Sequence, residues 1–245
     1  GNLRFVIAGK ITASRKQKIL DKIESLPLHE GKRFDFLCDK TLKPEAPIFI
    51  ERKDLKNLSF GLSIIVPRQL SDEEMDAMFA LNHILTGTMY SRIYGQARKR
   101  GLTYGIYSGA SRGIDNSSWD FEGQANYDTA EPLFRLIVDE LKKILDRQIS
   151  EADLDAMKSY ALGSFQMGGQ TVASTAGFYA GRYFWDGFIR EYKKQPEFIK
   201  HISREQIFKI ADEFIKNDIW VLGAVSGGEE TQIFRLNDEL KRLFA

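Results

Sequence analysis

The sequence is poor in the residues that most often build a self-contained chemical site. It has one cysteine, Cys38, and three histidines, His29, His83 and His201. A single cysteine excludes an internal disulfide framework and is compatible with a reducing compartment such as the cytoplasm. No two histidines lie within four residues of each other, so a helical zinc-binding His pair with a neighbouring Glu is absent. We therefore predict no catalytic residue, no metal ligand and no bound cofactor in this chain.

Charge of one sign and long apolar runs are also missing. The chain has 35 basic and 34 acidic residues, and its formal net charge of +1 gives no general field for binding nucleic acid. No stretch approaches the ~18 uncharged apolar residues of a transmembrane helix, so we expect no membrane span. The sequence does contain 17 Phe, 9 Tyr and 3 Trp, which are enough to drive collapse into a globular core.

The periodicity of apolar residues predicts an α+β fold. Strands are predicted at 3–9, 47–52, 58–66, 103–110, 117–127 and 219–225. Helices are predicted at 12–26, 71–87, 90–99, 129–147, 151–167, 172–189, 203–216 and 229–244. Strands cluster first and helices then run together, which favours a layered antiparallel or mixed sheet with helices packed on one face.

The two ends of the chain resemble each other. A strand–helix unit begins near Phe5, and a similar unit begins near Trp220. If the two units are equivalent parts of a repeated sequence, the chain starts with the last unit of one repeat and then contains one whole repeat. The natural protein is then expected to be longer at its N-terminus. We therefore divide the chain into a strand–helix tail at 1–27, a polar linker at 28–46 and a domain at 47–245.

Polar and aromatic residues are densest at 82–108. A helix ends at a turn of small residues, a short helix ends in the basic run 98–100, and a strand with Tyr104 and Tyr107 follows. Cations at a helix C-terminus often only complement the helix dipole, and strand tyrosines often only pack. The alternative is that Arg98 and Tyr104 project into one cavity, where they hold a peptide carbonyl or carboxylate.

This segment resembles the signature of the non-catalytic C-terminal half of insulinase/pitrilysin-type zinc metallopeptidases, the family that includes mitochondrial processing peptidase. The family pattern is Leu-Gly-Gly-Gly-Met-Ser-Ser-Arg-Leu-Phe, a basic turn, and then Arg-Gly-Leu-Ala-Tyr-Ser. Here it reads LTGTMYSRIY at 85–94 and RGLTYG at 100–105. The likeness covers about residues 57–227. Thr86 and Thr88 replace two glycines, which predicts a less permissive turn.

The resemblance implies a processing-peptidase-like half that closes over peptide substrates and helps to bind them. The zinc, held by an inverted His-x-x-Glu-His motif, is then expected in a separate N-terminal half or a homologous catalytic subunit. The tail at 1–27 would be the end of that catalytic half. The chain would be part of a zinc metalloendopeptidase and would hydrolyse no peptide alone.

The resemblance also implies two substrate-binding residues, because the family's second half supplies an Arg and a Tyr near the zinc. Tyr104 matches the Tyr directly. Arg98 matches the Arg when the alignment starts from Arg92, whereas Ala97 takes that position when it starts from Tyr104, since this chain is one residue shorter between them. We favour Arg98, because a turn absorbs a deletion more easily than a cavity loses its cation.

Two other functions stay open at this point. The chain could be a catalytically dead scaffold subunit of the same fold, or a stand-alone peptide-binding module. An intact His-x-x-Glu-His upstream of Gly1 or in a gene neighbour would favour the peptidase half, and its absence from both would favour the scaffold.

A second aromatic cluster lies at 178–188. On a helix, such a band usually forms the core or a helix–helix contact. The alternative is the lining of an enclosed peptide chamber, where aromatic rings bind extended chains without sequence preference.

Overall fold

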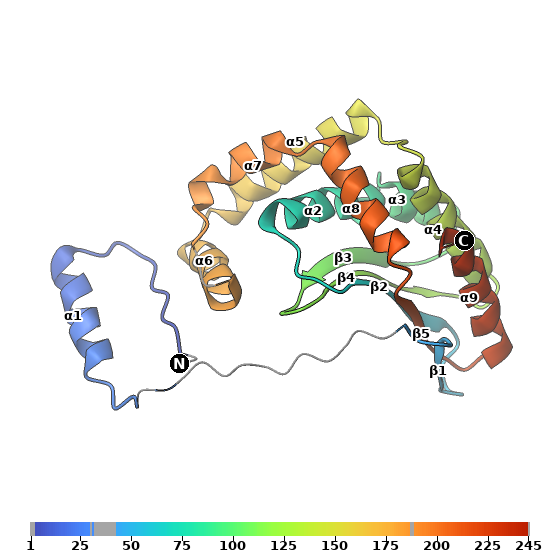
Figure 1. Cartoon of the computed structure of the whole chain (residues 1–245), viewed down its shortest axis with the longest axis horizontal. Coiled ribbons are helices and arrows are strands. Elements are labelled where there is room, and N and C mark those ends of the chain that lie inside the picture. Colours follow the sequence, from blue (N-terminus) through green and yellow to red (C-terminus); the bar gives the residue numbers. More distant parts are fainter. Residues whose placement is uncertain (1–2, 30, 32–42, 187–188, 245) are drawn as a thin grey trace. The chain divides into compact units, whose positions relative to one another are not determined.

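The computed structural model describes residues 3–29, 31, 43–186 and 189–244 (Figure 1). Cys38 lies outside these residues. By internal contacts the chain divides into two units, one of 1–37 with 159–200 and one of 38–158 with 201–245.

The larger unit contains a five-stranded mixed sheet. Its strands are β1 (Ile48–Glu51), β2 (Leu58–Val66), β3 (Ile106–Arg112), β4 (Ser117–Ala125) and β5 (Trp220–Ser226). Their spatial order is β1-β5-β2-β4-β3; β1 and β5 run parallel, and the other neighbouring pairs run antiparallel. The predicted α+β class with a layered mixed sheet is confirmed.

Strand β2 explains why this sheet has two different faces. Its alternate residues from Leu58 to Val66 are buried, whereas the residues between them are half-exposed. Successive side chains of a strand point to opposite faces, so one face packs and the other does not. Five helices lie on the packed side: α2 (Asp72–Thr86), α3 (Arg92–Lys99), α4 (Ala130–Leu145), α8 (Arg204–Lys216) and α9 (Glu230–Phe244) (Figure 1). No described helix of this unit covers the opposite face, which we call the open face.

The core fills the space between the sheet and these helices. Trp119 on β4 is buried against Phe214 of α8, with ring centroids 5.9 Å apart. Its indole N–H donates to Oδ1 of Asn82 on α2 at 2.9 Å, which satisfies the only polar atom of that side chain. Trp119 therefore ties two helices to the centre of the sheet.

The beginning of the chain differs from its prediction in one respect. Residues 3–9 form no strand, and Leu3, Phe5 and Ile7 are exposed. A strand needs a neighbour for its backbone hydrogen bonds, and within the described residues none pairs with this segment. The helix that follows is confirmed as α1 (Ala13–Glu24), where the Thr12 hydroxyl accepts from the Arg15 N–H at 3.3 Å.

The remaining helices are α5 (Glu151–Gly168), α6 (Val172–Asp186), the 3-10 helix η1 (Tyr192–Lys194) and α7 (Gln195–His201). Tyr192 connects the first two within the smaller unit. Its ring stacks on Phe165 at 4.4 Å and meets Phe178 edge-on at 5.0 Å, while its backbone N–H donates to the Tyr179 hydroxyl at 3.1 Å. For these two residues of the 178–188 cluster, the helix-contact interpretation is confirmed. Side chains at 185–188 lie outside the described part.

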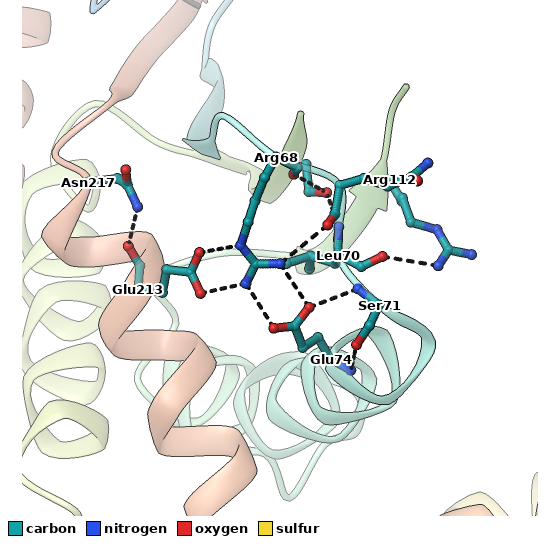
Figure 2. Close-up of polar contacts among 9 residues, drawn as sticks. Arg68, Leu70, Ser71, Glu74, Arg112, Glu213 and Asn217 are labelled. Atoms are coloured by element: carbon teal, nitrogen blue, oxygen red, sulfur yellow. Dashed lines mark hydrogen bonds and ion pairs between the residues drawn. The ribbon is translucent and has the colours of Figure 1, made fainter. Parts of the chain in front are cut away.

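Arg68, directly after β2, holds two helices together. Its guanidinium donates to both carboxylate oxygens of Glu74 on α2, at 2.9 and 2.8 Å, and to both of Glu213 on α8, at 2.6 Å each (Figure 2). Glu74 also accepts from the Ser71 N–H at 2.8 Å in the capping box of α2. Its hydrogen bonds to Arg68 lower the pKa of Glu74 to about 2.

We expect Arg68→Met to lower the free energy of unfolding by about 2 kcal/mol at neutral pH, because two partly buried carboxylates then face each other without a cation. The folded pKa of Glu74 lies below its usual value of 4.5. Its stabilising contribution is therefore complete above about pH 4.5 and is lost as the pH falls towards about 2. Urea unfolding over this pH range should show a steeper loss for the wild type than for Arg68→Met. If the free energy of unfolding falls equally with pH in the wild type and in Arg68→Met, Arg68 is not the cause of the lowered pKa of Glu74.

Candidate functional site

Helix α3 buries one side and leaves Arg98 at its margin. Ile93 and Ala97, one turn apart, are fully buried, whereas Arg98 is half-buried and Lys99 is exposed. The two alternative alignments place either Arg98 or Ala97 at the position of the family's Arg. Since Ala97 packs into the core, only Arg98 presents a side chain outward at this point.

The turn after α3 aims Tyr104 away from the core. Gly101 ends the helix with φ of 67°, in the left-handed region that favours glycine. Thr103 is buried; its hydroxyl lies 2.9 Å from the Gly105 carbonyl, contacts the Gln124 carbonyl on β4 and accepts from the Gly105 N–H at 3.1 Å. These hydrogen bonds close a bend at Tyr104, whose side chain is 85% exposed while that of Thr103 is buried.

The structure brings Arg98 and Tyr104 together. Cζ of Arg98 lies 4.9 Å from the centroid of the Tyr104 ring, within cation–π range. Among the described residues, no hydrogen bond or ion pair engages the Arg98 guanidinium or the Tyr104 hydroxyl. The pair is thus oriented by stacking while its hydrogen-bonding groups stay available to a ligand.

The other arginines of the segment are placed differently. Arg92 donates to the Asp153 carboxylate at 2.6 Å and so joins α3 to α5. Arg100 is exposed at the C-terminal cap of α3. Arg92 therefore has a structural role, and Arg98 is the arginine that stacks on Tyr104.

A groove of about 800 Å³ lies on the open face beside Tyr104. Gly61 of β2 and Gly223 of β5, which are paired, form its floor. Tyr94 of α3 and Tyr104 line it together with residues of all five strands, which include Ile48, Ile50, Ser59, Tyr107, Glu122, Gln124 and Val225. A Cβ added at Gly61 would meet no atom within 4 Å. Glycine at this position therefore leaves open space and relieves no clash.

Sequence reasoning missed the groove. The available signal was the series Ser59, Gly61 and Ser63, which places small residues at the alternate positions of β2 that face away from the helices. Of the two alternatives for Tyr107, the structure excludes core packing, because its side chain lies 65% exposed on the open face. The pattern alone could not show which strands lie beside β2, and the groove depends on that order.

The turn before α3 contains the two threonines that replace glycines of the family pattern. The Thr86 hydroxyl accepts from the Ser108 N–H at 2.9 Å and contacts the Ser108 hydroxyl at 2.8 Å, so this threonine links α2 to β3. Gly87 has an ordinary φ of −69°, and its Cβ would lie 2.3 Å from Nδ1 of His83. The turn therefore requires glycine at one position for space, and the threonines on either side introduce no strained backbone.

The described residues do not fit a zinc ion. They contain no group of three or more His, Cys, Asp or Glu side chains that could hold a metal. His83 is half-buried against Gly87, and this burial lowers its pKa. We assign no metal-dependent step to this part of the chain. None of the described helices combines the length and apolar character that crossing a bilayer requires.

These features define a one-sided α+β domain with a glycine-floored open face. Residues 1–160 match the family described as Peptidase M16 inactive domain, and the chain belongs to this family. The match includes the tail and the linker as well as strands β1 to β4. The resemblance to the non-catalytic part of insulinase-type metallopeptidases is thereby confirmed at the level of the family. A comparison with curated proteins finds no match.

Solved structures share this fold. A protease from Helicobacter pylori has a TM-score of 0.77 at 19% identity, with 89% of this chain and 54% of that chain covered. A peptidase M16 inactive domain from Pseudomonas fluorescens has a TM-score of 0.75 at 21% identity, with coverages of 90% and 53%. A chain of complex III from Candida albicans has a TM-score of 0.73 at 14% identity, with coverages of 91% and 56%. At these identities the similarity shows the fold, and this chain spans about half the length of each.

Proposed function

We propose that this chain binds peptides along its open face and presents them to a zinc site in a separate N-terminal half or catalytic subunit. Membership of the inactive-domain family supports a role in binding without hydrolysis. Because this chain covers only about half of each similar chain, we expect the zinc site in a separate half or subunit. The observation that carries the proposal is the Arg98–Tyr104 pair beside an open groove of about 800 Å³.

The chemistry of the pair suits a peptide backbone. A guanidinium supplies planar, charged N–H donors, and the Tyr104 hydroxyl can donate or accept. Hydrogen bonds from a charged donor are stronger than neutral ones, and they orient a carbonyl or carboxylate when bidentate. Tyr104 lines both the main groove and a second hollow of about 230 Å³ that contains Arg98. A peptide in the groove would therefore reach the pair at its edge.

The tail at 1–27 supports the expected second half. Helix α1 has no buried residues, and Phe5, Ile7 and Leu20 are exposed. The corresponding unit at the end of the chain is embedded, since β5 pairs on both sides and α9 buries an apolar face. We propose that the tail completes the sheet of the preceding half, that 28–46 is the linker, and that 47–245 is the inactive domain.

Reconstitution tests the proposed function. Peptide hydrolysis is measured for the chain alone, for the half or subunit with an intact His-x-x-Glu-His motif alone, and for the two together. We expect no hydrolysis by the chain alone, and about 10-fold or greater acceleration when both are present, because binding energy from one half then lowers the barrier at the other. Metal-dependent hydrolysis by the chain alone would overturn the proposal. Equal rates with and without the chain would favour a scaffold.

A further inference from the structure

We propose that Glu122 makes the groove selective for peptides with a basic side chain, arginine or lysine, at the position that lies over the floor. This inference rests on the proposed function, because it names which peptides the open face binds. Its basis is the charge complementarity between the Glu122 carboxylate and a basic side chain. Of the residues that line the groove, all of them described, Glu122 is the one charged at neutral pH.

Register places Glu122 beside the glycine floor of the groove. On β4 it lies directly opposite Gly61 of β2 on one side and opposite Tyr107 of β3 on the other. It is exposed on the open face, and no described side chain forms an ion pair or hydrogen bond with its carboxylate. A ligand in the groove therefore meets a carboxylate without a protein partner.

The neighbouring acid on the same face shows the contrast. Asp120, two residues earlier on β4, accepts from the Ser63 hydroxyl at 2.6 Å and from the Ser118 hydroxyl at 2.5 Å. Its carboxylate is satisfied within the sheet and lies outside the groove lining. Asp120 still adds negative charge beside Glu122, which strengthens the attraction for a cation.

The surroundings of Glu122 suit a long basic side chain. Gly61 and Gly223 leave the space beside it open, so an alkyl stem has room to lie on the sheet. Ile50 and Val225 supply apolar surface for such a stem, and Tyr107, the cross-strand neighbour of Glu122, adds an aromatic ring to the lining. An acidic side chain would fit the same space, but the Glu122 carboxylate would repel it.

Binding of labelled peptides to the 245-residue chain tests this selectivity. Three fluorescent peptides differ at one central position, which holds arginine, the neutral isostere citrulline, or glutamate. We expect the arginine peptide to bind about 10-fold more tightly than the citrulline peptide, as measured by anisotropy at low salt, and the glutamate peptide to bind most weakly. Glu122→Gln should remove the arginine preference, and Glu122→Lys should reverse the order of the arginine and glutamate peptides.

A matched control separates local from general charge effects. Glu73→Gln makes the same chemical change at an exposed position of α2, on the helix side of the sheet, and should leave the preference intact. Equal binding of all three peptides by the wild type, or an unchanged preference in Glu122→Gln, would overturn the selectivity and leave the proposed function standing. No binding of any peptide up to about 1 mM would instead contradict peptide binding on the open face.

Discussion

Arg98→Ala and Tyr104→Phe are each expected to lower kcat/KM of the peptidase assembled with its zinc-bearing half by about 10- to 150-fold, with the fold intact. The magnitude follows from the loss of a hydrogen bond to substrate that involves a charged group, about 1.5–3 kcal/mol. The fold should survive because neither side chain forms an ion pair or hydrogen bond with another described residue, and Arg98→Ala removes only the stacking of the guanidinium on the ring. Tyr104→Phe keeps the ring under the guanidinium and removes only the hydroxyl.

Three neighbouring arginine and lysine residues provide controls for this prediction. Lys99→Ala, on an exposed position of the same helix, should change kcat/KM little. Arg92→Ala should act differently, because it breaks the ion pair with Asp153 and should lower the stability of the chain. If Arg98→Ala is fully active while Arg100→Ala is not, the role belongs to Arg100. If kcat/KM is unchanged in all of these variants, including Arg98→Ala and Tyr104→Phe, the segment has a structural role only.

The sequence was sufficient for the elements whose causes are local. The strict alternation from Leu58 to Val66 predicted β2, because burial on one face imposes a period of two. Ser71 with acids in the next turn predicted the start of α2, and the capping box forms as those residues require. Arg98 and Tyr104 could be paired because one short turn separates them, so their proximity depends on few intervening residues.

The features that could not be predicted depend on distant parts of the chain. Arg68 lies between Glu74 and Glu213, and no local pattern indicates that α8 comes beside α2 (Figure 2). Glu122 faces the groove because β4 lies between β2 and β3, an order that alternation within one strand cannot give. The seven-residue α7 was missed because it is too short to show a helical period. The predicted strand at 3–9 did not form because, in the described part of the chain, no other segment pairs with its backbone.

Gly61→Ile is expected to weaken peptide binding by about 100-fold or more without unfolding the chain. The isoleucine side chain would project from the floor into the groove and occupy the space that a bound peptide needs. It would meet no protein atom at its Cβ within 4 Å, so the native packing has no reason to shift. Glycine inside a strand costs about 0.5–1 kcal/mol, and a β-branched residue suits a strand, so the free energy of unfolding should stay equal or rise.

The most direct test of the central claim, that the open face binds the peptide, measures peptide affinity and urea unfolding on the same samples of wild type, Gly61→Ala, Gly61→Val and Gly61→Ile. We predict little change in affinity for Gly61→Ala and increasing losses for Gly61→Val and Gly61→Ile, while the free energy of unfolding does not decrease in any of them. The small step to alanine serves as the internal control, since one methyl group fills little of a groove of about 800 Å³. A folded Gly61→Ile chain that binds peptide as tightly as the wild type would contradict the claim.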